Sequence, residues 1–130
     1  MFKKKIFIAG HNGMVGSSVL KTFKKIKKYK IITIDKKDLD LLDQVEVYKF
    51  LNKNKFHSVI ICAARAGGIY ANNKYRANFI FENLQIQNNL IYGSYINNVE
   101  KLIFLGSSCI YPKNCRQPMR EEDLLSGYLE

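Results

Sequence analysis

The chain has 130 residues, of which 47% are hydrophobic, and its formal net charge at pH 7 is +10. This length and apolar content allow one domain with a buried core and exclude a wholly disordered chain. Fourteen of the seventeen lysines fall in the first 55 residues and only four arginines occur, so a solvated basic surface is favoured over nucleic-acid binding.

The three cysteines, Cys62, Cys109 and Cys115, form no recognisable disulfide framework, which indicates a reducing compartment. Nearby histidines are too few for a zinc site, so no metal is expected. The apolar run after the first lysines is too short for a signal peptide, and no stretch is long enough to cross a membrane. We therefore expect a cytoplasmic protein with no membrane partner.

An apolar strand at Ile6–Ala9 runs directly into a turn of the form Gly-x-x-Gly-x-x-Gly, and a helix follows from about Met14. Gly10 allows a tight turn, Gly13 leaves room for a pyrophosphate beside the main chain, and Gly16 allows close packing of the helix. The free N–H groups and the positive dipole end of the helix would face the phosphates. A tight turn without a ligand is the less favoured alternative.

Strands and helices alternate along the rest of the chain. The further strands are expected at 31–34, 58–64 and 101–105, and the further helices after the capping residue Asp43 and at about 77–97, with a loop rich in glycine and asparagine at 67–73. This alternation predicts the α/β class, with a Rossmann-type, doubly wound parallel sheet. The expected strand order is 3-2-1-4.

That order places the fourth strand beside the first, so the chain turns at Gly10 and Gly106 would flank one crevice. Such a crevice is the topological switch point, where open α/β sheets bind ligands. We expect the glycine turn and the segment Ser107–Cys109 to line the same pocket, which would bind a nicotinamide nucleotide.

Asp35 ends the second strand, at the position where a carboxylate usually binds the ribose hydroxyls of adenosine. A carboxylate repels a 2′-phosphate, whereas Lys36 and Lys37 attract one, so these residues leave NAD and NADP both open. Asp40 and Leu41 could border the adenine or simply precede the next helix. An acidic strand end beside a solvated basic turn is the alternative without a ligand.

Ser107, Ser108 and Cys109 follow the fourth strand directly. A hydroxyl there can hydrogen-bond a substrate carbonyl, although serines after a strand more often form turns or helix caps. Cys109 could act as a general base if its thiol is partly ionised. His11 is expected to position the phosphate turn rather than to transfer protons.

Several blocks of sequence together carry a resemblance to a known family: residues 10–16, 63–69, 71–73, 104–113 and 117–119. They resemble the GDP-L-fucose synthase family of extended short-chain dehydrogenases/reductases, and the similarity extends over the whole chain. The resemblance implies an enzyme that epimerises GDP-4-keto-6-deoxy-D-mannose at C3 and C5 and then reduces C4 with NADPH, yielding GDP-L-fucose.

The resemblance also implies roles for individual residues. Ser107 would polarise the sugar ketone and Cys109 would be the base or acid of the epimerisations. The residues that would hold NADP(H) are Gly10, His11, Asn12, Gly13, Met14, Val15, Gly16, Lys36, Lys37, Asp38, Leu39, Asp40, Leu41, Leu105, Gly106, Ser107 and Ser108. Asn12 and Lys36 stand where the family has arginines near the 2′-phosphate, so we expect NADP to bind with reduced affinity.

The reductive step of the family needs a Tyr-x-x-x-Lys pair after the serine. Only Tyr111 and Tyr128 follow Ser108, and neither has a lysine four places on. The spacing at Tyr70 and Lys74 lies upstream of the serine, and we interpret it as coincidence. We therefore expect residues 1–130 to be an incomplete NADP-binding Rossmann domain without its later strands or a substrate domain, inactive alone, with the fourth strand as a bare edge.

Three hypotheses remain open at this point. The favoured one is the amino-terminal part of a GDP-L-fucose synthase. The second is a non-catalytic dinucleotide-binding module that pairs with another chain. The partners considered are a second copy of this chain, in a homodimer, and a complementing carboxyl-terminal chain. The third is a basic nucleic-acid-binding domain, which predicts salt-dependent binding of DNA and no saturable binding of NADPH.

Overall fold

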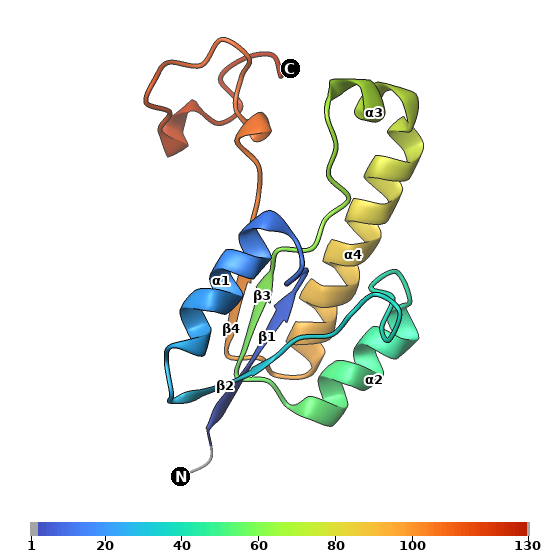
Figure 1. The fold of residues 1–130 in the computed structure, drawn as a ribbon. Helices are drawn as coiled ribbons and strands as arrows, with labels where there is room; N and C mark the ends of the chain where they lie inside the picture. Colours follow the sequence, from blue (N-terminus) through green and yellow to red (C-terminus); the bar gives the residue numbers. More distant parts are fainter. Residues whose placement is uncertain (1–2, 130) are drawn as a thin grey trace.

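The computed structural model describes residues 3–129 and consists of a parallel sheet with helices on both faces (Figure 1). The strands are β1 (Lys4–Ala9), β2 (Tyr29–Ile32), β3 (Ser58–Ile61) and β4 (Lys101–Phe104). The helices are α1 (Met14–Lys24), α2 (Gln44–Asn54), α3 (Ile69–Lys74) and α4 (Arg76–Ile96). The α/β class predicted from the alternation of elements is confirmed.

The strand order is β2-β1-β3-β4, so the predicted order 3-2-1-4 is wrong. β1 pairs in parallel with both β2 and β3, and β4 pairs with β3. Residues 35–43 form turns and irregular backbone and add no strand beyond β2. The chain therefore returns through α2 and adds β3 to the other side of β1. The connections change direction at β1, which places the topological switch point between β1 and β3.

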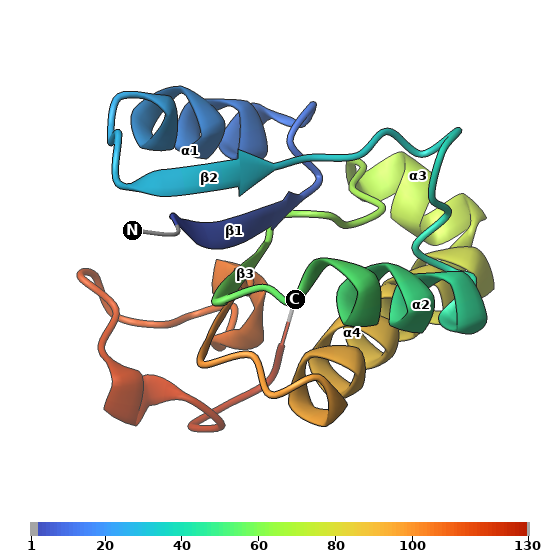
Figure 2. The same cartoon turned by 90° about the horizontal axis from the view of Figure 1, so that it is seen from below.

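The central strands are apolar because both of their faces are covered, and successive side chains point to opposite faces. One core cluster joins β1 and β3 to α2 and α4 and includes Phe7, Ile61 and Leu90. The other packs Ile6 and Ile8 against α1. Figure 2 shows α1 on one face of the sheet and α2 and α4 on the other.

Two local predictions have different outcomes. Asp43 caps α2, since its Oδ1 accepts a hydrogen bond from the Glu46 N–H at 3.0 Å, as predicted. The predicted loop at 67–73 instead contains most of α3. The Asn72 side chain donates to the carbonyl oxygens of Gly67 and Gly68 at 2.8 and 3.1 Å, which ties the glycines to the helix.

β4 lies at one edge of the sheet, and all four of its residues are exposed. In the described part of the chain β4 pairs with β3 alone. Residues 105–129 continue from its carboxyl end with two short 3₁₀ turns, at Ser108–Ile110 and Glu121–Asp123. None of the helices described in residues 3–129 is both long and apolar enough to span a bilayer.

Candidate functional site

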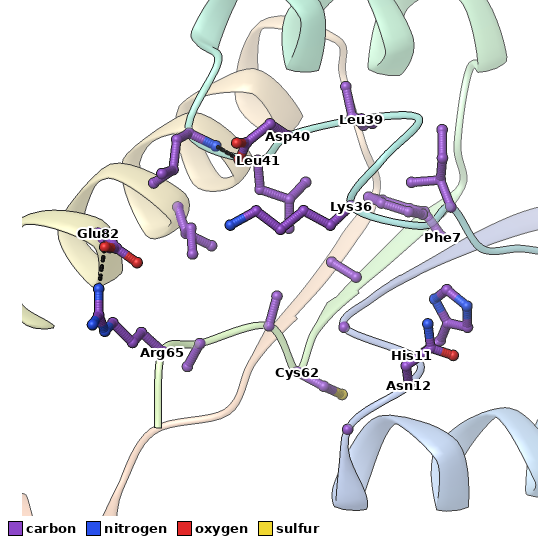
Figure 3. Close-up of a pocket in the computed structure, with 18 residues that line it drawn as sticks. Phe7, His11, Asn12, Lys36, Leu39, Asp40, Leu41, Cys62, Arg65 and Glu82 are labelled. Atoms are coloured by element: carbon purple, nitrogen blue, oxygen red, sulfur yellow. Dashed lines mark hydrogen bonds and ion pairs between the residues drawn. The ribbon is translucent and has the colours of Figure 1, made fainter. Parts of the chain in front are cut away.

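A pocket of about 380 Å³ opens at the carboxyl ends of β1 and β3 (Figure 3). Three segments form its walls: the turn after β1, residues 34–42 after β2, and residues 62–65 after β3. Glu82 and Ile86 of α4 complete it. This is the switch point of the observed sheet, where a ligand site is expected in an open α/β fold.

The glycine turn brings its backbone unusually close to the rest of the pocket. Gly10 has φ +81°, and a Cβ built on it would lie 2.6 Å from the Ala63 backbone nitrogen. A Cβ on Gly16 would lie only 2.1 Å from the Gly10 carbonyl oxygen. The tight turn at Gly10 and the close packing at Gly16, both predicted from the sequence, are therefore confirmed.

The N-terminus of α1 is suited to an anion. Gly13 is its N-cap and lines the pocket, no side chain caps the helix, and its first turn contains no acidic residue. The first N–H groups of a helix lack acceptors within the helix, and the dipole there is positive. Lys36 lines the same pocket and adds a full positive charge. A phosphate or pyrophosphate group matches these donors and this charge.

The turn is tied to the loop after β2 through Asp35. The prediction that Asp35 ends the second strand is wrong, because β2 ends at Ile32 and Asp35 lies three residues beyond it. The Asn12 Nδ2 donates to Asp35 Oδ1 at 2.7 Å, and His11 Nε2 lies 3.6 Å from the same oxygen. The Asn12 hydrogen bond ties the turn to Asp35, and the positioning role of His11 stays a prediction. The Asp35 side chain remains 47% exposed beside the pocket.

The third wall follows β3. Arg65 is ion-paired to Glu82 of α4 (Figure 3). Its guanidinium carbon lies 4.9 Å from the ring centroid of Phe79. Cys62 is partly buried at the start of this wall, and burial raises the pKa of its thiol. The thiol is therefore protonated at neutral pH and is a poor nucleophile.

Comparison with known proteins identifies the family of this chain. Residues 6–129 match the model of the NAD dependent epimerase/dehydratase family. The chain belongs to this family.

Comparison with individual proteins shows which members of this family the chain resembles. The chain is 52% identical over 127 residues to a GDP-L-fucose synthase of Sinorhizobium fredii and 45% identical over 130 residues to that of Escherichia coli. These matches cover 98% and 100% of the chain but 40% of each relative. The resemblance to the GDP-L-fucose synthases is thus confirmed, and the chain spans about two fifths of their length.

Two structures with bound NADP share the fold. A GDP-mannoheptose C4 reductase from Campylobacter jejuni is 41% identical, with a TM-score of 0.92, over 100% of this chain and 38% of its own. A GDP-L-fucose synthetase from Naegleria fowleri is 28% identical, with a TM-score of 0.83, over 98% of this chain and 38% of its own.

Part of the predicted cofactor site lies in the pocket of this chain. The predicted residues that line it are Gly10, His11, Asn12, Gly13, Lys36, Leu39, Asp40 and Leu41. Met14, Val15 and Gly16 lie just beyond it in the first turn of α1. Lys37 and Asp38 are exposed residues of the turn after β2 and are not part of its lining.

The expected crevice between the first and fourth strands is a wrong prediction, because β3 lies between them. Leu105, Gly106 and the segment Ser107–Cys109 follow β4 at the same edge of the sheet, but they do not line the pocket. β1 and β4 are two strand spacings apart, roughly 10 Å. Ser107 Oγ accepts a hydrogen bond from the Cys109 N–H at 3.2 Å and so caps a 3₁₀ turn.

Sequence reasoning missed the wall after β3. Residues 62–65 line the pocket although they were not predicted to bind a ligand. The signal was present, because the strand that pairs with β1 across the switch point contributes its carboxyl end to the site, but the wrong strand order assigned that place to the fourth strand. Glu82 and Ile86 carried no such signal, since their approach depends on how α4 packs.

Proposed function

We propose that the chain binds NADP(H) in the pocket between β1 and β3 and forms the cofactor-binding part of an enzyme with GDP-L-fucose synthase activity. The observation that carries the proposal is the N-terminus of α1, which has no side-chain cap and opens at the switch point, into the pocket that Lys36 also lines. The 52% identity to a GDP-L-fucose synthase supports the activity of the longer enzyme.

Two features bear on the choice of cofactor. Lys36 in the pocket and the NADP bound in two similar structures support NADP(H). Asp35 supports binding of NAD as well, although its Oδ1 already accepts a hydrogen bond from Asn12. We propose NADP(H) as the preferred cofactor, held with modest affinity because a lysine cannot form the bidentate contact of an arginine.

The proposed substrate is GDP-4-keto-6-deoxy-D-mannose. Its C4 ketone acidifies the protons at C3 and C5, so a base can remove each proton and an acid can return it to the opposite face. Cys109 would exchange these protons, and Ser107 would donate a hydrogen bond to the ketone oxygen. The bound cofactor would supply the hydride that reduces C4, and an acid would protonate the oxygen, which would yield an alcohol.

The 130-residue chain made alone is proposed to bind the cofactor without completing this reaction. Within it, neither Tyr111 nor Tyr128 precedes a lysine at the Tyr-x-x-x-Lys spacing, so the tyrosine acid and its lysine are missing from the reductive step.

The three free cysteines support the reducing environment of the cytoplasm as its location.

A fluorescence titration of the chain with NADPH tests the proposal, with NADH and a DNA duplex in parallel. We expect saturable binding of NADPH that is tighter than that of NADH. The absence of saturable binding, together with a steeply salt-dependent interaction with DNA, would refute it and favour nucleic-acid binding.

A further inference from the structure

One helix contacts the walls on both sides of the pocket. α4 packs against α2 and β3, and side chains from its middle turns reach the loop after β3 and the loop after β2. The two residues that make these contacts, Asn83 and Asn89, lie behind the walls and not in the lining. They act on the backbone of the residues that do line it.

Asn83 holds the backbone of Arg65 at two points. Its Oδ1 accepts a hydrogen bond from the Arg65 N–H at 2.7 Å, and its Nδ2 donates to the Arg65 carbonyl oxygen at 3.0 Å. The Arg65 side chain is anchored on the same helix by Glu82 and Phe79. The backbone and the side chain of this wall are thus both fixed to α4.

Asn89 holds the opposite wall. Its side chain is fully buried, and its Nδ2 donates to the Leu41 carbonyl oxygen at 2.8 Å. Its Oδ1 accepts a hydrogen bond from Gln85 Nε2, also at 2.8 Å, so the buried amide has a partner at both of its polar atoms. A buried amide with fixed partners permits one arrangement of the loop and penalises others.

We propose that Asn83 and Asn89 are positioning residues of the cofactor cleft. Each of them fixes the backbone of the wall that forms one half of the cleft. This inference rests on the proposed binding of NADP(H). The loop after β2 carries the residues that meet the adenosine ribose in this type of site, so Asn89 sets the adenosine half. The wall after β3 lies on the other side of the phosphate turn, so Asn83 sets the nicotinamide half.

The two halves are separable in a binding experiment with NADPH and with adenosine 2′,5′-bisphosphate, which lacks the nicotinamide half. For Asn83→Leu we expect the Kd for NADPH to rise about tenfold and that for the bisphosphate to change by less than about twofold. For Asn89→Leu we expect both Kd values to rise by a similar factor. Asn97→Ala is the control, because among residues 3–129 its Nδ2 donates to the Gly93 carbonyl oxygen of the helix that Asn97 caps, and to neither wall of the pocket.

Milder variants keep the test decisive if a leucine variant fails to fold. Asn83→Asp keeps an acceptor for the Arg65 N–H but replaces the donor to the Arg65 carbonyl oxygen by a negatively charged oxygen. Gln85→Ala removes the partner of Asn89 Oδ1. Asn83→Asp should raise the Kd for NADPH more than that for the bisphosphate, and Gln85→Ala should raise both Kd values by less than Asn89→Leu does.

Thermal unfolding of every variant separates positioning from general stability. If Asn83→Leu weakens both ligands in proportion to its loss of stability, or weakens neither, the inference is overturned. If the unsubstituted chain binds neither ligand, the proposed function itself fails. If the chain binds both and the asparagine variants behave like Asn97→Ala, the inference alone fails.

Discussion

Gly13 and Gly16 belong to one sequence motif, but the space around their Cα atoms differs. A Cβ on Gly16 would overlap the Gly10 carbonyl oxygen at 2.1 Å, whereas the nearest atom to a Cβ on Gly13 is 3.4 Å away. We predict that Gly16→Ala lowers the free energy of unfolding by about 1–3 kcal/mol. Gly13→Ala should lower it by less than about 1 kcal/mol yet weaken NADPH binding about tenfold or more, since its methyl group enters the space assigned to the phosphates.

Denaturant unfolding and NADPH titration of both variants check this pair. The account is contradicted if Gly13→Ala binds NADPH like the unsubstituted chain, or if Gly16→Ala is as stable as Gly13→Ala.

Cys62 provides a second residue-scale prediction. Because burial raises the pKa of its thiol, the reactive thiolate is scarce at neutral pH and its fraction grows as the pH rises. We predict that iodoacetamide modifies Cys62 more slowly than the exposed Cys109 at pH 7, and that NADPH slows the modification of Cys62 further. Peptide mass spectrometry after timed labelling measures both rates. Equal protection of Cys62 and Cys109 by NADPH would place the cofactor elsewhere.

Single residues were predictable from the sequence where their role is local. Asp43 caps α2 through a residue three places on, and the tight packing at Gly16 involves a turn six residues away. Arg65 and Glu82 were not predicted, because their ion pair joins a loop to a helix 17 residues later and depends on tertiary packing. Local spacing contains no information on such a contact.

At the scale of elements, the sequence identified all four strands but not their order. Alternation of strands and helices fixes a parallel sheet, yet the side of β1 on which β3 pairs depends on whether residues 35–43 extend the sheet beyond β2. They form turns instead. The missed helix α3 has a similar cause, since its glycines and asparagines favour a loop until the Asn72 side chain bonds the backbone before it.

The exposed edge strand β4 yields a prediction about association. Ile103 pairs with Ile60 on the face covered by α1, but at its own position it is 51% exposed. An apolar edge strand with free backbone groups promotes pairing between chains. We predict that the 130-residue chain self-associates with rising concentration, and that Ile103→Lys reduces this with a change in unfolding free energy below about 0.5 kcal/mol.

Light scattering over a concentration series measures the effect. Lys101→Glu, at the start of the same strand, is the control for a change of charge without loss of an apolar side chain. A strictly monomeric unsubstituted chain would contradict the prediction.

At the scale of the whole molecule, the chain spans 40% of the GDP-L-fucose synthases that it resembles. We predict that it does not reduce GDP-4-keto-6-deoxy-D-mannose alone, and that oxidation of NADPH appears when a polypeptide supplying the remaining part of such a synthase is added. The loss of NADPH absorbance follows the reaction, with the Gly13→Ala chain as the control. Turnover by the chain alone would show that no further acid is needed.

The central claim is that the pocket between β1 and β3 receives the dinucleotide, and a crystal structure of the chain with NADPH tests it most directly. The account predicts the pyrophosphate at the N-terminus of α1, the adenosine beside residues 36–41 and the nicotinamide half against residues 63–65. Nucleotide bound only along the lysines of α1, or against residues 112–129, would contradict it.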